Sequence, residues 1–192
     1  LFDQQQPGII RNYPVPQEWS NLDYISSKIG PDTPCSVEVG QYHSGERLDI
    51  TYGMYFDYLQ KVKQETSSGN QIPAEQILYL AQNEIPKELL SDFEIPHLCQ
   101  YAIDSDLAVG EGKLYHTMLW MGIKGCVSPL HNDPLDNVLV QVQGHKRVFL
   151  ISADTDPQNI YAGVGSLQNN TSPINVENPE WVKYPLLANV KV

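Results

Sequence analysis

The apolar residues in the first third of the chain recur with helical spacing. They stand three or four positions apart, at Leu22, Ile25 and Ile29. Ser20 precedes this pattern and Asp23 follows the serine by three positions, as in a capping box. Because Gly30 and the proline after it would end such a segment, the pattern predicts a helix between Ser20 and Gly30.

Three further elements are expected in this part of the chain. Val37 and Val39 alternate with polar residues and indicate a short strand at Ser36–Val39. Apolar positions from about Met54 to Gln64 again fit a helix, and a proline in the first turn favours a short helix from Pro86 to Phe93. The N-terminal part, up to about residue 110, is therefore predicted to be helical.

The second half changes from helical to strand periodicity. Tyr115–Met121 is rich in aromatic and aliphatic residues, and the valines of Asn137–Gln143 alternate on one face. Lys146–Ile151 follows after the two-residue connector Gly144-His145, so the last two segments are predicted to form a hairpin. Closely spaced strands with short turns favour a small barrel or sandwich.

Length and composition fit one folded, soluble domain. Of the 192 residues, 41% are hydrophobic, and no run reaches the roughly 18 apolar residues of a membrane span. We expect a single domain over residues 1–192, with the helical part packed on a β core from about residue 111 onward. The formal charge of −11 argues against nucleic-acid binding. It is compatible with a basic protein or peptide partner, or with solubility alone.

The cysteines indicate a reducing compartment. Cys35, Cys99 and Cys126 are scattered and show no C-x-x-C spacing, so neither a disulfide framework nor a zinc ribbon is expected. An intracellular location, nuclear or cytoplasmic, follows from this. The N-x-[ST] matches at Asn169 and Asn170 are therefore interpreted as loop chemistry. Since the chain begins without methionine, we expect it to be part of a longer protein.

An H-x-D motif at Ser128–Pro134 is the main candidate for chemistry. In an extended segment His131 and Asp133 can point to one side, because side chains alternate. They offer an imidazole and a carboxylate to a divalent metal, two of the three groups of a two-His-one-carboxylate site. The motif is short and occurs by chance, so a hydrogen-bonded surface histidine is the alternative.

Three neighbouring residues bear on this motif, and each has two interpretations. Lys146, one strand and one turn beyond Asp133, suits an anionic carboxylate or extends to solvent. Asn137 could bind a ligand or cap a turn. Trp120, taken alone, is more typical of core packing.

The stretch from Trp120 to Ile151 resembles the core of JmjC-domain oxygenases, above all their small single-domain hydroxylase group. The specific strings are S-P-L-H-x-D-P and N-x-L-V-Q-V-x-G-x-K, with further matches at 37–40, 79–82 and 176–179. The resemblance covers nearly the whole chain. It implies an α+β fold, mainly β with N-terminal helices: a cupin-like jelly-roll, the double-stranded β-helix.

The resemblance also implies a role for each candidate residue. His131 and Asp133 would be two of three ligands to Fe(II), and Lys146 would pair with the distal carboxylate of 2-oxoglutarate. The remaining roles are hydrogen bonds to that cosubstrate from Tyr79, Ser128 and Asn137, and a substrate-pocket wall from Trp120. The family's third ligand is a histidine on a late strand, and His145 is a poor substitute. We expect the third ligand and the last barrel strands to lie beyond Val192, or the protein to be an inactive relative.

The implied activity is hydroxylation, or demethylation, of a protein side chain, Arg or Lys, with Fe(II), 2-oxoglutarate and O2. Three alternatives stay open. One is a catalytically inactive cupin-like module that binds peptides. Another is an enzyme that hydroxylates a tRNA base, against which the charge of −11 counts. The last is a different cupin enzyme, which would use more histidine ligands and leave Lys146 without an anionic partner.

Overall fold

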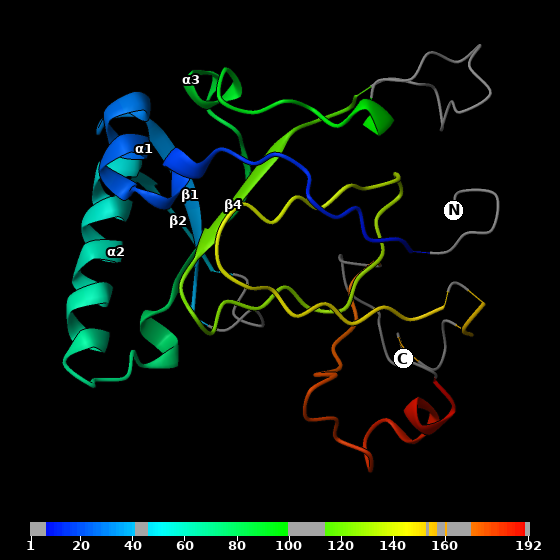
Figure 1. The fold of residues 1–192 in the computed structure, drawn as a ribbon. Coiled ribbons are helices and arrows are strands. Elements are labelled where there is room, and N and C mark those ends of the chain that lie inside the picture. The colour runs from blue at the N-terminus through cyan, green and yellow to red at the C-terminus, as the bar shows by residue number, and fades with distance from the viewer. Residues whose placement is uncertain are drawn as a thin grey trace.

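A four-stranded antiparallel sheet lies at the centre of the described part of the protein (Figure 1). The computed structural model describes residues 7–40, 46–99, 114–152, 154–156, 160 and 170–190. The strands are β1 (Pro34–Val39), β2 (Arg47–Thr51), β3 (Leu78–Glu84) and β4 (Met118–Gly122), in the order β2-β1-β3-β4. β3 therefore lies between β1 and β4, the strand that leads into the H-x-D segment.

Helices from the N-terminal half of the chain lie on one side of the sheet (Figure 1). The two longer ones, α1 (Leu22–Ile29) and α2 (Tyr52–Ser67), contact each other. The short helical segments are α3 (Lys87–Leu90), η1 (Gln17–Ser20), η3 (Ala74–Gln76), η4 (His97–Cys99) and η6 (Pro185–Asn189). Among the helices in the described ranges, none is long and apolar enough to cross a membrane. The predicted N-terminal elements are thus present, with ends shifted by a few residues. The prediction that this part is helical and that the strands begin near residue 111 is wrong, because β1, β2 and β3 all lie before residue 85.

α1 begins one residue later than the predicted capping box. Asn21, not Ser20, is the N-cap, and its side-chain oxygen accepts a hydrogen bond from Asp23 N at 2.9 Å. The prediction at Ser20 is wrong because this serine ends η1, while the asparagine, an equally good cap, stands one position nearer the helix. Gly30 ends α1 as predicted, with a φ of 83° that favours glycine.

The main core lies between these helices and the sheet. Val37 of β1, Tyr55 of α2 and Leu80 of β3 are fully buried there. The cluster consists of Trp19, Ile25, Ile29, Cys35, Val37, Tyr52, Tyr55, Phe56, Leu59, Leu80 and Leu89. Because burying one large apolar side chain contributes about 1.5–3 kcal/mol, this cluster holds β3 rigidly between its neighbours.

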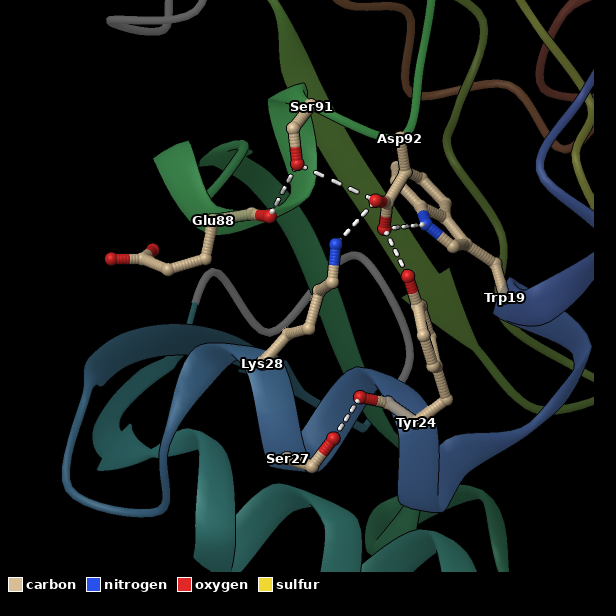
Figure 2. Close-up of polar contacts among 7 residues, drawn as sticks. All are labelled: Trp19, Tyr24, Ser27, Lys28, Glu88, Ser91 and Asp92. Carbon is tan, nitrogen blue, oxygen red and sulfur yellow. Dashed lines mark hydrogen bonds and ion pairs between the residues drawn. The ribbon is translucent and has the colours of Figure 1, made fainter.

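A half-buried carboxylate joins the N-terminal helices to the chain after α3 (Figure 2). Asp92 accepts hydrogen bonds from Trp19 Nε1 at 3.1 Å and from Tyr24 OH at 3.0 Å, and it also pairs with Lys28. Trp19 is 6% exposed and the Asp92 side chain 12%. Asp92 therefore satisfies two largely buried aromatic donors at once.

The predicted hairpin strands, Asn137–Gln143 and Lys146–Ile151, are not formed. Both segments are irregular and pair with none of the four strands. Gly144 between them does take the left-handed φ of 75° that suits a tight turn. Val138 and Val148 remain 41% and 53% exposed. The prediction is wrong because alternation defines the faces of a strand but does not supply a hydrogen-bonded neighbour.

Candidate metal and cosubstrate site

The ring of His131 lies against a backbone carbonyl. Its Nδ1 lies 2.7 Å from the carbonyl oxygen of Pro129. Because a carbonyl can only accept, a hydrogen bond at this distance requires a proton on Nδ1, and in a neutral ring Nε2 would then be the nitrogen available to a metal. Metal-binding histidines are commonly oriented by such a bond on the other ring nitrogen. The sequence analysis did not identify this partner, because a backbone carbonyl leaves no signal in the sequence.

The imidazole and the carboxylate of the H-x-D motif lie side by side. His131 Nε2 is 3.7 Å from Asp133 Oδ2. Asn137 Nδ2 donates a 2.8 Å hydrogen bond to the same oxygen, and it lies 3.4 Å from the carbonyl oxygen of Leu135. Asn137 thus orients Asp133 and closes a local turn. Its predicted contact with 2-oxoglutarate stays a prediction.

Residues 170–172 form hydrogen bonds with the backbone of the H-x-D motif. His131 forms an isolated antiparallel bridge with Thr171. Asn132 N donates to the Asn170 carbonyl at 3.0 Å, and the Asn170 side-chain amide donates to the Asn132 carbonyl at 3.0 Å. Asn170 thus has a structural role, whereas Asn169 lies outside the described residues.

Ser172 anchors this segment. Its side chain is buried, with 1% of the residue exposed, and its hydroxyl donates to the Ile160 carbonyl at 2.6 Å. Its backbone N–H donates to the Leu130 carbonyl at 2.7 Å. The sequence analysis missed Ser172, because a pairing between residues so far apart in the chain has no local pattern.

Tyr79 and Lys146 form a second polar pair, and their contacts with 2-oxoglutarate stay a prediction. Lys146 Nζ lies 3.4 Å from the hydroxyl of Tyr79 across 67 positions of sequence. Tyr79 is 7% exposed in β3, whereas Lys146 is largely exposed. An ammonium and a phenol hydroxyl together offer several donors to a carboxylate. Among the described residues, Ser128 is half-buried and makes no hydrogen bond to either member of this pair.

Gly122 makes room for this second pair. A Cβ at this position would lie 2.5 Å from Cys126 Sγ and 2.8 Å from Tyr79 Cδ2, both too close for real atoms. Burial raises the pKa of the Cys126 thiol to about 11, although the Lys146 charge opposes this shift. Cys126 therefore remains a neutral thiol at physiological pH and packs against Tyr79 as an apolar group.

Trp120 is not a core residue. It stands in β4 with 39% of its surface exposed. Two residues of β3, Ala81 and Gln82, face it across an irregularity in the ladder. Core packing is thus disfavoured, and the predicted pocket role stays open.

The donor set fits part of a metal site. An imidazole nitrogen and a carboxylate oxygen on one side of a short segment suit two adjacent positions on a ferrous ion. Within the described ranges, no third His, Cys, Asp or Glu joins them in a metal-binding group. His145, the poor candidate of the sequence analysis, is accordingly not part of such a group.

The antiparallel sheet, the H-x-D pair and the Tyr79–Lys146 pair are the features expected of a cupin-like domain of the JmjC type. The sequence model of the cupin-like domain family matches residues 1–192, and the chain belongs to this family. The JmjC resemblance and the cupin-like fold class are both confirmed.

Three relatives illustrate the range of similar proteins. Jumonji C domain-containing protein 5 of Drosophila melanogaster is 29% identical over 99% of this chain and 47% of its own length. Lysine-specific demethylase 8 of Danio rerio is 34% identical over 87% of this chain and 38% of its own length. The human tRNA wybutosine-synthesizing protein 5 is 25% identical over 100% of this chain and 61% of its own length. The chain thus spans less than half the length of the first two.

Proposed function

We propose that this chain belongs to an Fe(II)- and 2-oxoglutarate-dependent oxygenase that hydroxylates a protein side chain, Arg or Lys. The observation that carries the proposal is the orientation of the H-x-D pair. His131 Nε2 lies 3.7 Å from the Asp133 carboxylate, and Nδ1 lies 2.7 Å from the Pro129 carbonyl oxygen, in a chain of the cupin-like family. His131 and Asp133 are both exposed, so a hydrogen-bonded surface histidine is the alternative that the metal titration below distinguishes.

His131 and Asp133 would hold the iron, together with a ligand outside the described residues. Iron of this kind, with 2-oxoglutarate and O2, supplies the oxidising power to place a hydroxyl group on an unactivated carbon. The protein's own contribution begins with ligand orientation, by the Pro129 carbonyl and the Asn137 amide. Each removes a rotational freedom that the free side chain would have.

Tyr79 and Lys146 would bind the distal carboxylate of 2-oxoglutarate. The Lys146 ammonium lies 3.4 Å from the hydroxyl of the buried Tyr79, so an anion beside both groups would meet one charged and one neutral donor. Hydrogen bonds to a charged group contribute about 1.5–3 kcal/mol each. Ser128, half-buried just before the H-x-D motif, would add a further donor.

Charge and relatives support a basic polypeptide as substrate. The net charge of −11 attracts a chain rich in Arg or Lys. Trp120, 39% exposed on β4, offers a flat face to a guanidinium or to an aliphatic stem. The name of one relative, lysine-specific demethylase, records the same residue class for that protein. On an N-methyl carbon the same hydroxylation would end in loss of the methyl group.

A tRNA base is the second candidate substrate, favoured by the match to a tRNA wybutosine-synthesizing protein over 100% of this chain. The acidic net charge counts against it, because RNA binding needs a basic face. Incubation of the full-length protein with Arg- and Lys-rich peptides and with tRNA separates the two. A peptide that gains the mass of one oxygen atom supports the first candidate, and a modified nucleoside supports the second.

The metal site is tested by anaerobic titration of the full-length protein with Fe(II) and 2-oxoglutarate. A weak charge-transfer absorption band is expected from the wild type. It should persist in His116→Ala, whose histidine is exposed and paired with Glu84, and vanish in His131→Ala. A wild type without any band contradicts the proposal and favours the non-catalytic peptide-binding module.

A further inference from the structure

The ladder between β3 and β4 contains a bulge opposite Trp120. The registered pairs are Tyr79↔Gly122, Leu80↔Met121, Asn83↔Leu119 and Glu84↔Met118. Ala81 and Gln82 therefore share the single partner position of Trp120. Bulges of this kind re-aim side chains and are frequent beside functional sites.

The bulge contains a strained residue. Gln82 has a φ of 53°, in the left-handed region that residues with a Cβ disfavour. Such a conformation persists only where neighbouring contacts impose it. Two sets of hydrogen bonds hold the bulge in this conformation.

Asn83 provides the first of these contacts, with its side chain acting in place of backbone. Its Oδ1 accepts from Ser36 N at 2.9 Å, and its Nδ2 donates to the Ser36 carbonyl at 2.8 Å. The amide thus pairs with β1 as a peptide group would. Backbone registration between β1 and β3 covers only Glu38↔Tyr79 and Val39↔Leu78. The side chain of Asn83 extends the attachment of β3 to β1 beyond the bulge.

The carbonyl of Ala81 provides the second contact. It accepts from Asn83 Nδ2 at 3.1 Å and from Arg47 Nη2 at 3.1 Å. Arg47 comes from β2 and is itself held by Ser36 Oγ at 3.2 Å and Glu38 at 3.0 Å. The planar guanidinium reaches all three acceptors, which a lysine ammonium could not do with the same geometry. One network across β2, β1 and β3 therefore fixes the bulge.

We propose that Asn83 is a positioning residue for the substrate side of the site: its amide, with Arg47, fixes the bulge and thereby the place of Trp120. The inference rests on the proposed function, because Trp120 is taken as the wall of the substrate pocket. The cosubstrate side is held differently. Tyr79 is anchored to β1 by backbone registration before the bulge, so its contact with Lys146 does not depend on Asn83.

The test compares Asn83→Ala with Asn70→Ala in the full-length protein. Asn70 is a matched control, because among the described residues its side-chain amide bonds with Glu65 in a surface turn and with no residue of the sheet. Hydrogen exchange at the Ser36 amide should accelerate about tenfold or more in Asn83→Ala, since its described partner is Asn83 Oδ1. Acrylamide quenching of Trp120 should change in the same variant. It is read in a Trp181→Phe background, because Trp181 is exposed and Trp19 is buried.

The half-saturating concentration of 2-oxoglutarate separates a positioning role from a general structural one. A general structural defect would change it, whereas a defect confined to the substrate side would not. We expect it to stay unchanged in Asn83→Ala, while the KM for a peptide substrate rises. Unchanged Ser36 exchange and Trp120 quenching overturn the inference. A parallel loss of 2-oxoglutarate binding also overturns it, because the effect would then not be confined to the substrate side.

Arg47→Lys keeps the inference testable if Asn83→Ala does not fold. It removes the planar donor to the Ala81 carbonyl but keeps a cation beside Glu38, so a smaller change at Trp120 in the same direction is expected. No change at Trp120 in Arg47→Lys overturns the network. The Ser36 and Trp120 readouts need no metal. Failure of the proposed function therefore shows in the wild-type titration, separately from failure of this inference.

Discussion

Replacing Asp92 by asparagine should destabilise the protein by about 2–3 kcal/mol, on the basis of two aromatic donors that bond to a charged acceptor. Trp19 Nε1 and Tyr24 OH lie 3.1 and 3.0 Å from the Asp92 carboxylate, and Trp19 is 6% exposed (Figure 2). Each such bond contributes about 1.5 kcal/mol. Both donors bond to the same oxygen, Asp92 Oδ2, so the asparagine oxygen can keep both bonds. Without the negative charge each bond loses about 1 kcal/mol, and the new amide group faces the Lys28 ammonium. The Lys28 pair lies at the surface and is screened, so it adds little.

Urea unfolding followed by tryptophan fluorescence measures this change. The midpoint should fall in Asp92→Asn at an unchanged slope, while the matched variant Asp57→Asn, on the exposed face of α2, should stay within about 0.5 kcal/mol of wild type. A loss below about 0.5 kcal/mol in Asp92→Asn would refute the role of the carboxylate as an organising acceptor.

The same carboxylate predicts a sign for the pH dependence. The hydrogen bond from Lys28, followed by those from Trp19 and Tyr24, holds the pKa of Asp92 below its usual value against the opposing effect of burial. The stability it contributes is therefore complete above the unfolded pKa of about 3.9 and is lost as the pH falls through the lower folded pKa. Asp92→Asn should lose less stability than wild type over that acid range.

Three further changes test other parts of the structure. Lys146→Ala should raise the half-saturating concentration of 2-oxoglutarate in succinate-release assays about tenfold or more, whereas Lys124→Ala, in a neighbouring exposed turn, should not change it. The same half-saturating concentration in both variants would remove Lys146 from the cosubstrate site. Gly122→Ala should weaken 2-oxoglutarate binding in the anaerobic titration, because its Cβ would push Tyr79 aside, and unchanged binding would contradict this packing. Tyr52→Phe should leave the thermal midpoint unchanged or higher, since the buried Tyr52 hydroxyl has no hydrogen-bond partner among the described residues; a clear loss would reveal a partner.

Local patterns predicted local features well. The spacing of Leu22, Ile25 and Ile29 located α1, because a helix is stabilised by neighbours within one or two turns. The H-x-D spacing likewise predicted that His131 and Asp133 lie side by side. Tyr79 and Lys146 were paired only through the family resemblance, since no periodicity links residues 67 positions apart.

Features that depend on partners far away in the chain could not be predicted from the sequence. The alternation in Asn137–Gln143 was read as a strand, although a strand exists only where another pairs with it. Asn83, Ser172 and Asp92 looked like ordinary polar residues, and each owes its role to acceptors or donors on another element. Gly122 gave no signal because its function is the absence of a side chain next to Cys126 and Tyr79.

The bridge between His131 and Thr171 couples the position of the proposed iron ligand to that of residues 170–172. A substitution at Ser172 could alter how tightly a metal is held without touching any ligand, since the serine hydroxyl is tethered to Ile160 and its N–H to Leu130. Substitutions in this segment could thus change the metal affinity of related proteins while the H-x-D motif itself stays the same.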